Sequence, residues 1–152
     1  MRSALDEYLE RLKGKRVAVL GIGVSNRPLI DLLCQAGIAV TACDKRDRDS
    51  FNGLIEKLEA NGVSCHLGPD YLDHLDGMDV IFRTPGLRPD LPQLERAKAA
   101  GAELTSEMEA FFSVCPCRIL AVTGSDGKTT TTTIIAGLLS ASGYRTYVGG
   151  NI

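Results

Sequence analysis

Hydrophobic positions in the first 113 residues follow two spacings. Residues 3–13 carry apolar side chains at the i, i+3, i+4 and i+7 positions of an amphipathic helix, and Ser3 with Asp6 matches a capping box at its start. Beyond them, short apolar runs rich in β-branched residues alternate with helical segments. We expect strands at residues 16–21, 38–44, 63–67, 79–83 and 103–105, and helices at residues 28–36, 54–60, 91–100 and 106–113.

Continuous apolar strands separated by helices are typical of a parallel sheet that is covered on both faces. We therefore predict an α/β fold for residues 1–114, with a Rossmann-like, doubly wound parallel sheet. Right-handed crossovers place every loop that follows a strand at one edge of such a sheet. Ligands bind at that edge, so candidate site residues are sought directly after the strands.

A second unit is predicted after Pro116, and we assign residues 115–152 to the start of another domain. Residues 118–123 and 145–149 have the pattern of strands, on either side of a helix at residues 128–142. One strand–helix–strand unit cannot cover both faces of a sheet, so we expect it to be a truncated part of a larger domain. Its uncovered apolar edges predict that this chain dimerises through the second unit, or that the segment is mobile.

Composition narrows the class of protein. Seventeen basic and nineteen acidic side chains give a net charge of -2, without the basic excess typical of partners of nucleic acid or anionic membranes. The N-terminus lacks the apolar core of a secretory signal, and the longest uncharged stretch is too short and polar to span a bilayer, so we expect a cytoplasmic protein. Five cysteines without CxxC spacing argue against a disulfide framework or a zinc site.

The loop at residues 21–26 follows the first strand and opens the first helix of the sheet. Gly21 and Gly23 permit a tight turn and let backbone N–H groups approach an anion, which suits a pyrophosphate. Asn26 replaces the third glycine of the dinucleotide fingerprint, which weakens the case for NAD, and its amide suits either a phosphate or a helix cap. Asp44 ends the second strand, where such folds read the sugar or base of a nucleotide.

Residues 84–86, Thr-Pro-Gly, follow the fourth strand and should lie at the same edge. A plain turn built by Pro and Gly accounts for them equally well, and only their position favours a ligand.

The segment TGSDGKTT at residues 123–130 is the more specific signal. Strand, glycine loop, Lys-Thr and helix come in the order of a phosphate-binding loop, although Val122 stands where the longer pattern has its first glycine. In such a loop Lys128 reaches the β- and γ-phosphates, and the Thr129 hydroxyl ligates Mg²⁺. The sequence therefore predicts an ATP and Mg²⁺ site formed by Gly124, Ser125, Asp126, Gly127, Lys128, Thr129 and Thr130.

Both loops on one chain resemble those of the Mur ligases of peptidoglycan synthesis, whose ATP loop is similar to TGSDGKTT. The segments VLGIGVSNRPLIDLL, TACDK, RTPGL and GGNI resemble the branch that adds D-glutamate, and the resemblance covers essentially the whole chain. It implies three domains: a Rossmann-like domain for the UDP-sugar, a central ATPase domain and a C-terminal domain for the amino acid.

The resemblance also implies a reaction. ATP phosphorylates the alanyl carboxylate of UDP-N-acetylmuramoyl-L-alanine, and the amine of D-glutamate attacks the acyl phosphate to form an amide, while Lys128 and Mg²⁺ stabilise the transferred phosphoryl group. The implied substrate contacts are the pyrophosphate at Gly23, Val24, Ser25 and Asn26 beside the Gly21 turn, uracil at Asp44 and Lys45, the sugar-phosphate region at Thr84, Pro85 and Gly86, and the muramoyl part at Asn151.

Two departures qualify this resemblance. Asp126 replaces the family's usual Asn and puts a carboxylate among phosphates, which should weaken nucleotide binding unless it helps hold a metal. The family's later Mg²⁺ ligands, modified lysine and glutamate-binding domain would follow Ile152, so we expect no ligase activity from these residues alone. The full-length protein is expected to be a monomer.

Two rival functions stay open at this point. An NAD-dependent enzyme explains Gly21, Gly23 and Asp44 but leaves the Lys128 loop without a role. A non-catalytic nucleotide-binding regulator built on the same sheet is the second. Within the family, ligases that add L-alanine or a diamino acid have opening loops that look different from GIGVSN.

Overall fold

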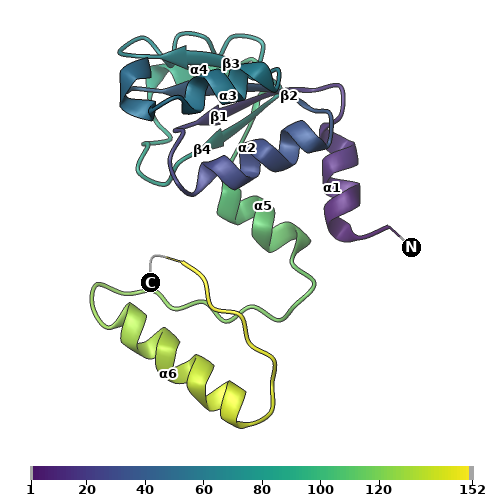
Figure 1. Ribbon diagram of the computed structural model, residues 1–152, viewed down its shortest axis with the longest axis vertical. Helices are drawn as coiled ribbons and strands as arrows, with labels where there is room; N and C mark the ends of the chain where they lie inside the picture. Colours follow the sequence, from purple (N-terminus) through teal and green to yellow (C-terminus); the bar gives the residue numbers. More distant parts are fainter. Residues whose placement is uncertain (1, 151–152) are drawn as a thin grey trace. The chain divides into compact units, whose positions relative to one another are not determined.

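The computed structural model describes residues 2–150, and the chain divides into two compact units, Met1–Pro116 and Cys117–Ile152 (Figure 1). Each unit is described by itself. The elements of the first unit are α1 (Ala4–Leu12), β1 (Arg16–Leu20), α2 (Asn26–Gln35), β2 (Ala39–Asp44), the 3-10 helix η1 (Arg48–Phe51), α3 (Leu54–Ala60), β3 (Ser64–Leu67), β4 (Val80–Arg83), α4 (Pro92–Ala99), β5 (Glu103–Thr105) and α5 (Glu107–Val114).

The first unit is built on a five-stranded sheet in the order β3-β2-β1-β4-β5, with every neighbouring pair parallel. The chain winds outward from β1 through β2 to β3 and then crosses to β4 on the other side of β1. The strand order therefore reverses between β1 and β4, the place at which open α/β sheets bind ligands. The predicted parallel α/β fold is confirmed.

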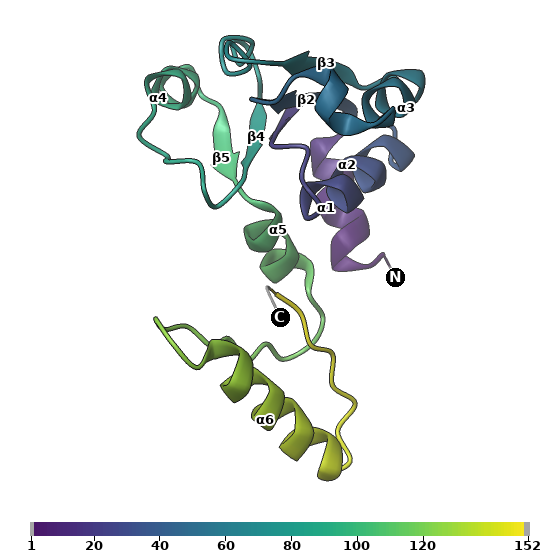
Figure 2. The same ribbon diagram turned by 60° about the vertical axis from the view of Figure 1, so that its left-hand side comes forward.

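Two hydrophobic clusters cover the two faces of this sheet. Along β1, Val17 and Val19 belong to one cluster, whereas Ala18 and Leu20 belong to the other, as the two-residue period of a strand requires. The first cluster takes side chains from α1, α2 and α3, and the second takes Leu94 and Ala97 from α4. Figure 2 shows α4 on the opposite side of the sheet from α2 and α3.

Local sequence explains where the helices begin. The Ser3 hydroxyl of the predicted capping box accepts the Asp6 N–H at 3.1 Å, and the Asp6 carboxylate accepts the Ser3 N–H at 2.9 Å. Helix α2 begins at Asn26, two residues before the predicted start, because Pro28 fits within a first turn whose N–H groups have no partner in the helix. The short η1 was not predicted.

The second unit contains α6 (Lys128–Ala141), which lies between two extended segments (Figure 1). The predicted strands at residues 118–123 and 145–149 were wrong: no residue from 117 to 150 is assigned to a strand, and none of them is buried. A strand needs ladder hydrogen bonds to a neighbour, and an apolar run without one stays extended.

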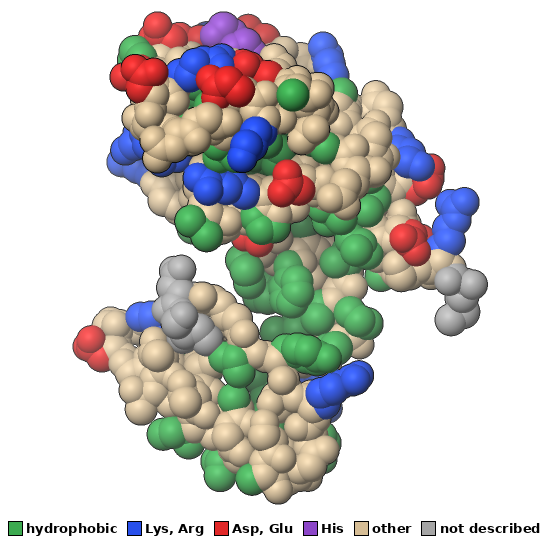
Figure 3. All heavy atoms as spheres, in the orientation of Figure 1, with side chains coloured by type: hydrophobic (Ala, Val, Ile, Leu, Met, Phe, Trp, Pro, Cys, Tyr) green, Lys and Arg blue, Asp and Glu red, His purple; other side chains and the backbone are tan. Residues whose placement is uncertain are grey.

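The outer surface fits the balanced composition. Basic and acidic side chains are interspersed over the first unit on the face drawn in Figure 3. Exposed hydrophobic side chains gather over α5, from Met108, Phe111 and Phe112. None of the helices within residues 2–150 has the length and apolar character needed to cross a membrane.

Candidate functional site

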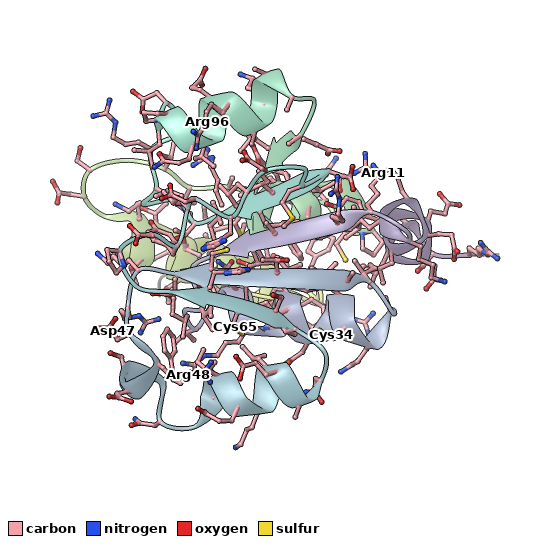
Figure 4. The ribbon with its side chains drawn as sticks, turned by 90° about the horizontal axis from the view of Figure 1, so that it is seen from above. Arg11, Cys34, Asp47, Arg48, Cys65 and Arg96 are labelled. Carbon is pink, nitrogen blue, oxygen red and sulfur yellow. The ribbon has the colours of Figure 1, made fainter. Side chains whose placement is uncertain are left out.

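A cavity of about 350 Å³ lies where the carboxyl ends of β1, β2 and β4 meet. Figure 4 shows this end of the sheet: Asp47 and Arg48, which follow β2, lie at the opposite end from Arg11, which precedes β1. The cavity is lined by Leu20, Gly21, Gly23, Ser25, Asn26, Asp44, Lys45, Arg46, Tyr71, Thr84, Gly86 and Leu87.

Most of the predicted substrate residues therefore lie around one cavity, although they come from three separate parts of the chain. Val24, which is 83% exposed, and Pro85 are not part of the lining. Asn151 lies outside the described residues. The turn at residues 84–87, closed by the Leu87 N–H to the Thr84 carbonyl at 3.0 Å, is both a plain turn and a wall of the cavity.

The two glycines of the first loop, Gly21 and Gly23, have different structural roles. The Gly21 N–H donates to the Cys43 carbonyl at 2.7 Å, and the φ of +93° at Gly21 then turns the chain away from β1. A Cβ on Gly21 would lie 3.5 Å from the Thr84 side chain, whereas a Cβ on Gly23 would meet nothing within 4 Å. The backbone at Gly23 is therefore open to the cavity, as an anion-binding loop needs.

The Asn26 side chain holds the loop from within. This residue is 6% exposed, and its Nδ2 donates to the carbonyls of Leu20 at 3.1 Å and Gly21 at 2.9 Å. The amide nitrogen thus ties the start of α2 to the end of β1, a use that differs from both of the expected ones, phosphate binding and helix capping. Ser25, at the N-cap position, makes no side-chain hydrogen bond to the helix.

Asp44 is a charged residue of the cavity lining, and it accepts hydrogen bonds on both of its carboxylate oxygens. Its Oδ2 accepts the Ile22 N–H at 2.7 Å and Arg46 Nη2 at 2.9 Å, and its Oδ1 accepts the Arg46 N–H and Nε, each at 3.0 Å. Burial alone would raise the pKa of this carboxyl, but the hydrogen bonds from Arg46 and Ile22 outweigh it and hold the pKa below its ordinary value. The carboxylate is therefore ionised at neutral pH.

These contacts fill the roughly four lone-pair positions of an ionised carboxylate. The guanidinium of Arg46 is fixed in turn, since its Nη2 also reaches the Ile22 carbonyl at 3.3 Å and its plane lies over the Phe51 ring at 4.3 Å. A ligand group that binds the Asp44 carboxylate must therefore exchange with a contact that Arg46 makes now.

Four residues of the lining were missed by sequence reasoning: Leu20, Arg46, Tyr71 and Leu87. Arg46 could have been found, because a guanidinium two residues after a strand-end carboxylate can fold back onto it. Tyr71 lies in the irregular connection between β3 and β4, where no periodic pattern indicates which side chains face a cavity.

In the second unit, the lysine of the predicted ATP loop forms hydrogen bonds with the backbone of the loop. Lys128 Nζ donates to the carbonyls of Gly124 at 2.7 Å and Ser125 at 3.1 Å. Gly127, with a φ of +74°, occupies the N-cap position of α6, and all seven predicted residues from 124 to 130 are exposed. The loop and the helix start are thus available to a phosphate ligand.

A second hollow of about 420 Å³ contains none of the predicted site residues. It is lined by Asp47, Arg48, Asp49, Cys65 and Leu67. Arg48 is already paired there with Glu59 at 2.6 Å and with Glu56 at 3.1 Å. Burial raises the pKa of the Cys65 thiol to about 11, which makes it a poor nucleophile. Within residues 2–150, no three His, Cys, Asp or Glu side chains are grouped to hold a metal ion.

The fold and the cavity together define a Rossmann-like α/β domain whose glycine loop opens onto a ligand site at the carboxyl ends of the strands. A family model, Mur ligase MurD-like, N-terminal domain, matches residues 15–106. The chain belongs to this family.

Curated relatives support the same family. The chain is 54% identical over 152 residues to UDP-N-acetylmuramoylalanine–D-glutamate ligase of Ruminiclostridium cellulolyticum, and 53% identical to the protein of that name from Clostridium botulinum strain Loch Maree. Each match covers 100% of this chain and 33% of the relative, so the chain spans about a third of their length.

A solved structure resembles the fold. The murein peptide ligase of Psychrobacter arcticus matches with a TM-score of 0.56 and 26% identity, over 86% of this chain and 27% of that one.

Proposed function

We propose that this chain is the N-terminal part of an ATP-dependent ligase that adds D-glutamate to UDP-N-acetylmuramoyl-L-alanine, and that its first unit binds the UDP-sugar. The curated relatives carry the name of this activity and match over the whole chain. One structural observation supports the proposal above others: the ends of β1, β2 and β4 bring most of the predicted substrate residues around one cavity.

The cavity suggests how the substrate lies. The open backbone at Gly23 and the start of α2 suit the diphosphate, because N–H groups and the helix dipole both favour negative charge there. The end of β2, with Asp44 and Lys45, is then the place for uracil. Thr84, Pro85 and Gly86, after β4, take the sugar-phosphate region, and Val24 and Asn151 remain proposed contacts of the pyrophosphate and the muramoyl part.

NAD fits this cavity poorly. Dinucleotide-binding folds use a free acidic residue at the end of the second strand to bond the ribose hydroxyls. Here the Asp44 carboxylate is occupied by Arg46 and Ile22, and Asn26 stands where the third glycine should allow close packing. A UDP-sugar does not need a third glycine in the loop, and uracil can bind beside Asp44 by exchanging with one contact of Arg46.

For the second unit we propose that residues 115–152 begin the ATPase domain, a division supported by the separate compact unit from Cys117 onward. The residues present fit ATP and Mg²⁺: exposed backbone at Gly124 and Gly127, the ammonium of Lys128 and the hydroxyl of Thr129. Bound Mg²⁺ would neutralise phosphate charge. Lys128 would exchange its bonds to the loop carbonyls for phosphate oxygens, and Ser125, Asp126 and Thr130 would complete the loop.

The proposed reaction belongs to the longer protein. There, ATP phosphorylates the alanyl carboxylate, and the amine of D-glutamate attacks the acyl phosphate and releases phosphate. The proposed substrates are small molecules, and ATP and a UDP-linked sugar are among the ligands, which supports a cytoplasmic location. We propose that the full-length protein is a monomer and that the 152 residues alone bind the UDP-sugar without catalysing the reaction.

Isothermal titration calorimetry of the chain with UDP-N-acetylmuramoyl-L-alanine and, separately, with NAD tests the proposal. We expect saturable binding of the UDP-sugar and at least tenfold weaker binding of NAD. Tighter binding of NAD would replace the proposal with the NAD-dependent alternative. Binding of neither ligand would favour a regulator of another kind.

A further inference from the structure

We propose that Tyr71 is a specificity-determining residue of the UDP-sugar site, whose ring contacts the nucleobase. The inference rests on the proposed function and names a residue outside the set that the sequence predicted. Tyr71 lies in the irregular connection between β3 and β4 and lines the same cavity as Asp44, Lys45 and Arg46.

Backbone hydrogen bonds fix this part of the connection against the end of β2. The Gly68 N–H donates to the Asp44 carbonyl at 3.0 Å, and the Tyr71 N–H donates to the Gly68 carbonyl at 3.3 Å. The ring is only partly exposed and packs against the second hydrophobic cluster. Tyr71 is therefore a fixed part of the cavity wall, and its backbone is positioned by hydrogen bonds that lead back to β2, the strand that carries Asp44.

The order of the strands indicates which part of the ligand lies next to Tyr71. The anion-binding loop follows β1, in the middle of the sheet, while Tyr71 and Asp44 lie to the side of β2 and β3, and Thr84 lies to the side of β4. A nucleotide whose diphosphate lies at the middle must extend its base to one side. The β2–β3 side offers an aromatic side chain, whereas the β4 side offers a hydroxyl, a glycine and a leucine.

The chemistry of the lining favours a base at Tyr71. Its ring is the aromatic group among the lining residues, the others being aliphatic, glycine, hydroxyl, amide or charged. Aromatic rings contact the π-face of any base favourably. Burial, followed by the nearby Asp44 charge, raises the pKa of the Tyr71 phenol, so its hydroxyl stays protonated at neutral pH and can donate a hydrogen bond.

Two substitutions separate base recognition from support of the fold. Tyr71→Ala removes the ring, and Tyr71→Phe keeps it. Tyr147→Ala, at a tyrosine of the second unit that is 78% exposed, is the matched control. Each variant is titrated calorimetrically with UDP-N-acetylmuramoyl-L-alanine and with UDP, and inorganic pyrophosphate is measured as a competitor of the UDP-sugar. Urea unfolding of each variant records its stability.

We expect Tyr71→Ala to bind UDP and the UDP-sugar about tenfold more weakly, which is within the range measured for base–aromatic contacts, and to bind pyrophosphate as the wild type does. Tyr71→Phe and Tyr147→Ala should stay within about twofold of the wild type. Equal affinity of wild type and Tyr71→Ala for UDP, or an equal loss for UDP and pyrophosphate, would overturn the inference and leave the proposed function standing. A wild-type chain that binds no UDP-sugar would overturn both.

Discussion

The carboxylate of Asp44 lies 2.7 Å from the backbone nitrogen of Ile22, and this hydrogen bond joins the end of β2 to the glycine loop that follows β1. The same carboxylate holds Arg46 through both of its oxygens. The shape of the loop that is proposed to bind the diphosphate therefore depends on a side chain 22 residues further along the chain. Asp44 supports the site through the loop, whether or not it also touches the ligand.

Substitution of Asp44 by Asn should destabilise the first unit in a pH-dependent way. Its folded-state pKa is lowered from 3.8, so the carboxylate's contribution is complete above that pH and is lost as the pH falls through the folded-state pKa. We expect Asp44→Asn to lose about 1–2 kcal/mol of unfolding free energy at neutral pH and progressively less below about pH 4. Urea unfolding across pH measures this, with Asp49→Asn, an exposed carboxylate of η1, as the control. A deficit that does not change with pH would contradict the ionic role.

The two loop glycines should respond differently to alanine. Gly21→Ala forces a side chain to a φ of +93°, so we expect it to lower the unfolding free energy by about 1–3 kcal/mol. Gly23→Ala places its methyl in open space, so stability should change by less than about 0.5 kcal/mol while UDP-sugar affinity falls about tenfold. Calorimetry and urea unfolding on both variants check this. Unchanged binding by Gly23→Ala would show that the ligand does not approach this backbone.

Asn26→Asp, a nearly isosteric substitution, tests the hydrogen bonds by which the Asn26 amide ties the start of α2 to the end of β1. In Asn26→Asp a carboxylate oxygen would face the carbonyl oxygens of Leu20 and Gly21 in place of a donor. We expect a loss of about 3 kcal/mol in unfolding free energy, because one buried and one partly buried carbonyl lose the amide donor and face a new charge. Asn61→Asp, at the exposed end of α3, is the matched control. Similar stabilities of the two variants would mean that the Asn26 amide does not hold the loop.

Substitution of the acidic residue in the ATP loop should strengthen ligand binding, whereas the substitutions above weaken binding or stability. Asp126 is exposed within residues 124–130, and a carboxylate there repels phosphates. Asp126→Asn should therefore tighten ATP binding about fivefold, an effect of about 1 kcal/mol, and leave UDP-sugar binding unchanged. Equilibrium binding of a fluorescent ATP analogue in the presence of Mg²⁺ measures it. Weaker binding by Asp126→Asn would show instead that Asp126 helps to hold the metal.

Most elements of the first unit could be predicted because burial alone sets their pattern. The strand at residues 79–83 and the helix at residues 54–60 differ from the structure by at most one residue at their ends. The strands predicted around α6 failed for a physical reason, since a strand also needs a hydrogen-bonded neighbour, which an apolar run does not reveal.

Some features of the candidate site could likewise be predicted from the sequence, and others could not. Gly21, Asp44 and Thr84 could be placed at one edge because parallel topology puts strand ends together. The bonds from Asn26 to the Leu20 carbonyl and from the Ile22 N–H to Asp44 could not, because they depend on side-chain directions across separate elements. Tyr71 could not either, since the connection that carries it follows no regular period.

Chemical-shift mapping of the backbone amides on addition of UDP-N-acetylmuramoyl-L-alanine tests the central claim most directly. A sugar-nucleotide in the cavity should give its largest shifts at the amides of Ile22 to Asn26, with further shifts at Lys45, Arg46 and Gly86. Shifts confined to the hollow beside Arg48, or to the opposite end of the sheet near Arg11, would contradict a UDP-sugar site at the carboxyl ends of the strands.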